Sequence, residues 1–283
     1  MVKAQMALPP DPPPVTFLGG LEPDQNIYRI FSQSRFEEML FHKKLALVRP
    51  ALWDDPYENF IHQLSVVVDG RTVGLDPIRQ SYWSLNPESD AMWRIYAPPP
   101  EKKGIRVTTT VQKLANVLHN RTKQMGMPQH SPHKCFVGKV SYLDFSEMMP
   151  LMLNSNARME IISDTTGRMQ ATTLLIKRPA FAHEQEVRAI YNNVGEPDKD
   201  TFPDVIPFDI DPDEFIEQIC FDPRMLNVFN EEKKKLQDRG IKIPIVISLL
   251  YEPLENAVLK KFSGYAIFSH LKYYQSLNIY SLT

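Results

Sequence analysis

Cysteine and glycine are scarce in this 283-residue chain. Its two cysteines, Cys135 and Cys220, are too few for a disulfide framework or for a zinc site made of four thiolates. His130 and His133 stand near Cys135 at a spacing close to that of metal ligands, but no second ligand pair accompanies them, so we predict a solvated loop and no metal site. With only 11 glycines, the sequence also lacks the glycine-rich phosphate-binding motifs and the usual hydrolase motifs.

Long apolar segments are missing as well. The sequence contains no run of about 18 apolar residues of the kind that crosses a bilayer. Prolines at positions 9, 10, 12, 13 and 14 interrupt any signal-peptide core. We therefore expect a cytoplasmic protein with no membrane partner.

Neither sign of charge is in large excess. The sequence has 32 Lys and Arg residues and 34 Asp and Glu residues, which gives a net charge of −2. This balance argues against a wholly basic nucleic-acid binder. A local basic patch stays open, because the polar connector over residues 119–139 contains Arg121, Lys123, Lys134 and Lys139.

Proline is abundant, at 24 residues, and five of the first fourteen positions are proline. Such a density favours extended backbone, so we predict an N-terminal tail over residues 1–25. Residues 26–283 then form a single α+β domain of short strands and helices that do not alternate strictly.

Four segments carry the clearest structural patterns. Residues 26–31 and 78–84 read as strands, residues 66–73 as a hairpin around Asp-Gly, and residues 186–191 as a short late strand. A helix is expected to open at Ser34, where Glu37 stands at the spacing of a capping box.

Three clusters combine aromatic and charged residues: residues 53–58, residues 82–84 together with 92–96, and residues 177–188. Aromatic rings beside arginine and carboxylates suit a site that stacks a flat ring and holds phosphates. The alternative for Trp53, Trp83 and Trp93 is a place in the core.

Glu184, Glu186 and Arg188 share one face of a strand by the two-residue period, so they are candidates to line a cleft. The same spacing fits a surface ion pair of small energetic effect. The sequence leaves both interpretations open.

Taken in order along the chain, these clusters resemble a bacterial family catalogued only as domain of unknown function 2971. The resemblance covers about residues 26–225 and implies no function. It is carried by Tyr28-Arg29-Ile30, Leu47 through Trp53-Asp54-Asp55-Pro56-Tyr57-Glu58, Tyr82-Trp83-Ser84, Ala91-Met92-Trp93-Arg94-Ile95-Tyr96, Gly104-Ile105-Arg106-Val107, and Lys177-Arg178 through Phe181, Glu184 and Glu186-Val187-Arg188.

A second resemblance is to the ADP-ribosyltransferase fold, in particular its DNA-targeting toxin branch. Tyr28-Arg29 is similar to that fold's first strand, Tyr82-Trp83-Ser84 to its second element, and Glu184 with Glu186 to its late E-x-E strand. The resemblance implies a split β-sheet core that binds NAD as a substrate.

The same resemblance implies a role for each residue. Arg29 would pair with the dinucleotide, and Tyr82, Trp83 or Tyr96 would stack on nicotinamide. Glu186 would hold the ribose, and Glu184 would orient or deprotonate the acceptor. The candidate catalytic residues are Glu186 and Glu184, and the candidate NAD-binding residues are Tyr28, Arg29, Trp53, Tyr82, Trp83, Ser84, Trp93, Arg94, Tyr96 and Arg188.

We therefore expect an NAD-consuming transferase or NAD glycohydrolase, with a protein or nucleic acid as acceptor and a role as a bacterial toxin or phage-defence effector. One alternative is a non-catalytic module of the same fold that senses a nucleotide or binds a partner. The other is an effector that acts directly on nucleic acid.

Overall fold

The computed structural model describes residues 15–52, 65–68, 71–74, 78–98, 103–124, 133–164, 166–193, 203–251, 259–262 and 265–268. The chain divides into two compact units, Met1–Ser248 and Leu249–Thr283. In the second unit, strands β15 (Leu259–Phe262) and β16 (Tyr265–Phe268) pair as an antiparallel hairpin. Everything that follows concerns the first unit.

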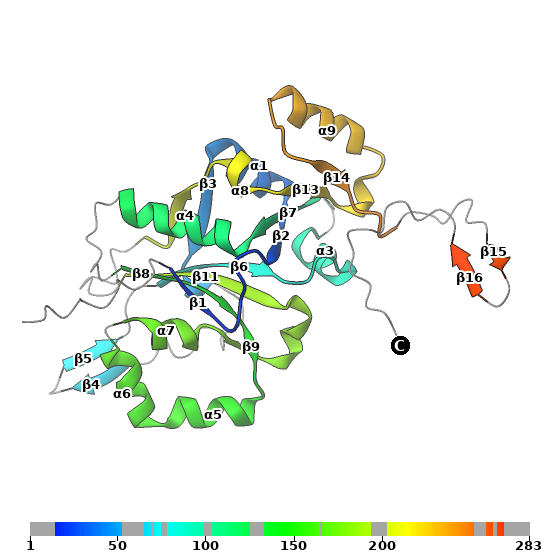
Figure 1. Ribbon diagram of the computed structural model, residues 1–283. Coiled ribbons are helices and arrows are strands. Elements are labelled where there is room, and N and C mark those ends of the chain that lie inside the picture. The colour runs from blue at the N-terminus through cyan, green and yellow to red at the C-terminus, as the bar shows by residue number, and fades with distance from the viewer. Residues whose placement is uncertain are drawn as a thin grey trace, which may run out of the picture. The chain divides into compact units, whose positions relative to one another are not determined.

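A mixed sheet forms the centre of this unit (Figure 1). Its main path runs β1-β8-β11-β6-β2-β7-β13-β14, and β3 joins it through β6 and carries β12 at its other edge. The strands are β1 (Thr16–Leu18), β2 (Asn26–Ser32), β3 (Lys44–Val48), β6 (Ile78–Ser84), β7 (Gly104–Thr110), β8 (His133–Lys139), β11 (Glu186–Asn193), β12 (Val205–Asp209), β13 (Gln218–Phe221) and β14 (Ile245–Ile247). The mixed, non-alternating order of helices and strands agrees with the predicted α+β class.

Helices cover both faces of the sheet (Figure 1). On one face, α1 and α4 supply apolar side chains to the main core, and on the other α7 packs against β8 and β11. The helices are α1 (Gln33–His42), α3 (Asp90–Tyr96), α4 (Val111–Gln124), α5 (Phe145–Leu153), α6 (Ser155–Ser163), α7 (Arg168–Thr173), α8 (Pro212–Phe215) and α9 (Phe229–Asp238), with 3-10 turns η1 (Pro50–Leu52), η2 (Pro179–Glu184) and η3 (Pro223–Met225). None of the helices in the described ranges combines the length and apolarity that a bilayer crossing requires.

Two short pairs of strands stand apart from the sheet. The arms predicted around Asp69-Gly70 form β4 (Ser65–Val68) and β5 (Arg71–Gly74), which pair antiparallel. Strands β9 (Ser141–Tyr142) and β10 (Ile176–Lys177) pair in parallel. Strand β1 lies inside the range predicted as a tail, residues 1–25, and pairs with β8.

The pairing of β2 is unequal on its two sides. Along its whole length it pairs with β7, but it meets β6 at one registered pair, Tyr28 opposite Ser84. Strand β6 pairs along its length with β11, which places Glu186 opposite Ser84 and Arg188 opposite Tyr82. Arg29 on β2 and the charged start of β11 are therefore neighbours of the same short stretch of β6.

Gly104 offers a test of the packing between β7 and α3. A Cβ at this position would lie 2.9 Å from the Cβ of Ala97 and 3.0 Å from the buried ring of Trp93. We expect Gly104→Ala to lower the free energy of unfolding by about 1–3 kcal/mol, because the core would have to shift around the added methyl group. Urea unfolding measures this, with the exposed Leu226→Ala as control, expected within about 0.5 kcal/mol of wild type. Equal stability of Gly104→Ala and wild type would contradict the packing.

Candidate functional site

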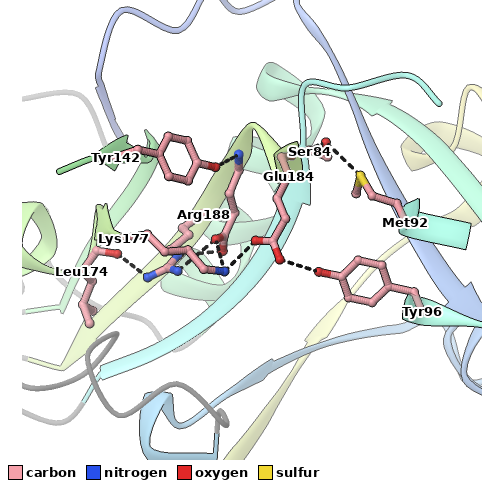
Figure 2. Close-up of polar contacts among 9 residues, drawn as sticks. Ser84, Met92, Tyr96, Tyr142, Leu174, Lys177, Glu184 and Arg188 are labelled. Carbon is pink, nitrogen blue, oxygen red and sulfur yellow. Dashed lines mark hydrogen bonds and ion pairs between the residues drawn. The ribbon is translucent and has the colours of Figure 1, made fainter. Parts of the chain in front are cut away.

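Two acidic and two basic side chains, Lys177, Glu184, Glu186 and Arg188, form a buried group that we call the carboxylate cluster (Figure 2). The Lys177 Nζ lies 2.6 Å from Glu184 Oε2 and 3.2 Å from Glu186 Oε2. Arg188 donates from Nε to Glu186 Oε1 at 2.7 Å and from Nη2 to Glu186 Oε2 at 2.9 Å. The four formal charges sum to zero, so the cluster is buried without a net charge.

The backbone around the two glutamates is fixed from neighbouring strands. Gln185 between them has a left-handed conformation, φ 43°, which lets both side chains reach the same cluster. Ser84 donates its hydroxyl to the Glu184 carbonyl at 2.5 Å, and the Glu186 N–H donates to the Tyr142 hydroxyl at 2.8 Å. Ser84, which was predicted to bind the ligand, is buried and holds the backbone of Glu184.

The ionisation of Glu186 is controlled by its basic neighbours. Burial alone would raise its pKa, but the charge and hydrogen bonds of Arg188, followed by those of Lys177, outweigh burial and hold its pKa below the usual range. Glu186 is only 2 % exposed and Arg188 is 0 % exposed. Arg188 was predicted to bind the ligand, and the structure places it inside the protein as the partner of Glu186.

A run of aromatic contacts leads from Arg29 to the cluster. The Arg29 guanidinium carbon lies 4.6 Å from the ring centre of Phe31 and 4.4 Å from that of Tyr82. Tyr82 stacks on Tyr96 with 5.1 Å between ring centres, and we call this pair the tyrosine stack. The Tyr96 hydroxyl donates to Glu184 Oε1 at 3.4 Å (Figure 2). Burial raises the pKa of both tyrosines, so both hydroxyls stay protonated at neutral pH.

Arg29 lacks hydrogen bonds that its position would allow. Its Nε and Nη1 are buried and have no hydrogen-bond partner. Among the residues that the structure describes, no carboxylate forms a salt bridge with Arg29. Because buried N–H groups are rarely left unpaired, this guanidinium is a candidate site for an anion.

Two of the predicted ring-stacking residues belong to the core. Trp83 and Trp93 are each 1 % exposed. Trp83 points to the face of β6 opposite Tyr82 and packs edge-on against Phe215. Trp93 donates its ring N–H to Glu88 at 3.0 Å. Both rings thus pack in the core, which is the alternative that the sequence left open, and their binding of NAD stays a prediction.

Two further predicted NAD-binding residues, Arg94 and Tyr28, are not brought into the site. Arg94 is exposed and pairs with Asp90 at 2.8 Å, one turn earlier on α3. Tyr28 is half-buried, and the Arg106 guanidinium lies 5.4 Å from its ring centre. Trp53 lies outside the described residues.

The basic connector is described only at its ends. Arg121 belongs to α4, and Lys134 and Lys139 belong to β8. Cys135 is buried, which raises the pKa of its thiol to about 12. Over the ranges set out above, no group of three or more His, Cys, Asp or Glu side chains is arranged to hold a metal ion.

Sequence reasoning missed Lys177 and Tyr142 as members of this site. Lys177 falls within the third motif cluster, but a lysine before a turn is usually solvated. Tyr142 is 44 residues from Glu186 along the chain, and nothing in its surroundings signals the contact.

No family model and no curated protein sequence matches this chain, so the resemblance to domain of unknown function 2971 is not supported. Among solved structures, the chain is similar to Thermus sp. 2.9 DarT in complex with ADP-ribosylated ssDNA, with 14 % identity, a TM-score of 0.36, and coverage of 81 % of this chain and 96 % of that one. For DarT of the same organism in complex with NAD+, the identity is 12 %, the TM-score 0.35 and the coverage 81 % and 97 %. These likenesses are distant, and the function below rests on the geometry of this chain alone.

The lowered pKa of Glu186 predicts how stability depends on pH. Its ionisation stabilises the fold above the unfolded-state pKa of about 4.3, and this contribution is lost as the pH falls through the lower folded-state pKa. Glu186→Gln leaves Arg188 buried without its carboxylate, so we expect a loss of about 3–5 kcal/mol at pH 7. The difference from wild type should shrink below about pH 4.

Urea unfolding at a series of pH values measures this difference. The double variant Glu186→Gln/Arg188→Met is the matched control, since removing both charges should recover much of the loss. A gap between wild type and Glu186→Gln that does not change with acid would contradict the pairing.

Proposed function

We propose that this protein consumes NAD, cleaving the bond between nicotinamide and ribose as an ADP-ribosyltransferase or an NAD glycohydrolase. The observation that carries the proposal is the pair of buried, unpartnered N–H groups on Arg29, beside a tyrosine stack that ends at the Glu184 carboxylate. The cation, the ring-stacking surface and the carboxylate lie in one row and would match the diphosphate, the nicotinamide ring and the ribose between them.

Binding divides between the cation and the rings. Arg29 would donate to oxygens of the diphosphate, because a guanidinium suits the geometry of phosphate and two of its donors lack partners. The nicotinamide would stack on Tyr96, whose hydroxyl is neutral at physiological pH, since the ring of Tyr82 already contacts both Tyr96 and the Arg29 guanidinium. The sparse pairing between β2 and β6, which meet at one registered pair, supports the predicted split β-sheet core.

The reaction would break the bond between nicotinamide nitrogen and C1′ of ribose. The bonding electrons leave with nicotinamide, and positive charge develops on the sugar as in glycoside cleavage. A carboxylate aimed at the sugar stabilises this charge more in the transition state than in the ground state. The acceptor, either water or a nucleophile of a macromolecule, then bonds to C1′ and gives up its proton to a base.

We assign the carboxylate that faces the sugar to Glu184. Its Oε1 lies on the side of the tyrosine stack, whereas both oxygens of Glu186 are occupied by Arg188. Glu186 would instead fix Arg188 and Lys177. This reverses the order of importance that the E-x-E resemblance implies.

Nicotinamide release from NAD tests the proposal. We expect Glu184→Gln to lower kcat by about 100–1,000-fold, because a preorganised charge that acts in the transition state is lost. Arg29→Met should mainly raise KM, because its contacts to the diphosphate are present in both ground and transition states. Each variant is checked for folding by circular dichroism and thermal unfolding.

Arg35→Met is the matched control for Arg29→Met, because Arg35 is an exposed arginine on α1 that pairs with Glu38. It should keep wild-type kinetics. A folded Glu184→Gln variant with the turnover of wild type would end the assignment of Glu184, and a wild-type protein that releases no nicotinamide would end the proposal of NAD cleavage.

The occupied oxygens of Glu186 favour one second candidate, a non-catalytic module that binds a dinucleotide. In that case ADP-ribose and NAD would both raise Tm, because a ligand that binds only the folded state stabilises it, and nicotinamide would not be released. The same samples used for the kinetics decide between the two candidates.

A further inference from the structure

Lys177 links the two glutamates of the carboxylate cluster. It ends the short strand β10, outside the central sheet, yet its side chain is only 7 % exposed. Its ammonium lies between Glu184 and Glu186, closer to Glu184, and over the ring of Phe181 at 4.5 Å. The backbone holds Lys177 in place, since its carbonyl accepts from the Leu143 N–H at 3.0 Å.

The two basic side chains of the carboxylate cluster contact the two glutamates at different distances. Arg188 meets Glu186 through two hydrogen bonds at 2.7 and 2.9 Å. The Lys177 ammonium is 3.2 Å from Glu186 but 2.6 Å from Glu184. The Lys177 ammonium therefore contacts both glutamates but lies closer to Glu184, whereas Arg188 contacts Glu186.

Without that ammonium, Glu184 would stand beside Glu186 in a buried setting. Two carboxylates that approach one nitrogen within about 3 Å are close enough to repel, and burial adds to the tendency of one of them to take up a proton. The other titratable or charged groups on the elements around Glu184 are Arg29, Tyr82, Tyr96, Tyr142, His183 and Arg188.

We propose that Lys177 is a positioning residue for NAD cleavage: its ammonium binds one oxygen of the Glu184 carboxylate and holds the other directed toward the tyrosine stack. This inference rests on the proposed function. It extends that function by naming a residue that would touch neither NAD nor the acceptor.

The experiment compares Lys177→Met with Lys177→Arg by nicotinamide release over a range of pH. We expect Lys177→Met to lower kcat by about 100-fold with little change in KM for NAD, because Arg29 and the tyrosine stack are left in place. The acid limb of its pH–rate profile should move to higher pH, since Lys177 is one of the groups that lower the pKa of Glu186, and that pKa rises when the ammonium is lost. Lys177→Arg keeps the charge and should restore most of kcat and the acid limb.

Arg178→Met is the matched control. Arg178 is the next residue, carries the same charge and also lies over Phe181, at 5.5 Å, but no hydrogen bond joins it to either glutamate of the cluster among the contacts described. It should keep the wild-type pH profile. Folded Lys177→Met and Lys177→Arg variants that lose activity equally, with no shift of the acid limb, would overturn the positioning role.

A double-mutant cycle separates this inference from the proposed function. Urea midpoints are measured for Lys177→Met, Glu184→Gln and the double variant, which requires no activity. Effects that simply add would overturn the inference, whereas a double variant less destabilised than the sum supports it. Absence of nicotinamide release by wild type would defeat the proposed function while the cycle still decides whether Lys177 holds Glu184.

Discussion

The two hydrogen bonds between Arg188 and Glu186 support the rest of the site. Both side chains are inside the protein, where an unpaired carboxylate or guanidinium would be strongly unfavourable. Their pairing makes the burial of Glu186 tolerable at the start of β11, next to the turn that carries Glu184. It also leaves the Lys177 ammonium available to Glu184, so one structural ion pair determines the charge available to a second carboxylate.

The charged groups on the two sides of this ion pair differ. On the side of β11 and β10, two acidic and two basic groups cancel, whereas on the side of β2 Arg29 has buried donors without partners. An anionic ligand would therefore be attracted toward Arg29 and would not be repelled by a net negative cluster. The tyrosine stack lies between the two sides, and its hydroxyls remain neutral because burial raises their pKa. In the proposed function, this arrangement would separate the place that binds the negative diphosphate from the place where positive charge develops on the sugar.

Much of the framework follows from local sequence patterns. Alternation predicted strands at residues 26–31, 78–84 and 186–191, and these became β2, β6 and β11. The sequence did not predict which side chains of β6 point to which face of the sheet. Strand β6 is covered on both sides, and its apolar and polar residues are buried together. Tyr82 and Trp83 are neighbours with similar side chains, and only the register of β6 against β11 decides which one meets Arg29 and which one enters the core.

The long-range contacts of the carboxylate cluster could not be predicted from the sequence for a different reason. The two-residue period would place Glu184 and Glu186 on one strand face, but Glu184 ends a 3-10 turn and reaches the cluster because Gln185 has a positive φ. Lys177 and Tyr142 come from a short pair of strands, β9 and β10, that has too few residues to show a pattern. Such contacts depend on tertiary packing, which the local composition does not encode.

The buried pairing also limits which glutamate can perform chemistry. A carboxylate whose two oxygens accept hydrogen bonds from one guanidinium, and whose pKa is lowered by that neighbour, is a weak base and cannot turn toward a ligand without breaking both bonds. Glu184 has one oxygen on Lys177 and the other at 3.4 Å from the Tyr96 hydroxyl, a long contact that a ribose hydroxyl could replace. In the proposed function, the two glutamates therefore have different roles set by their surroundings: Glu186 would fix the structure of the site and Glu184 would supply the reactive carboxylate.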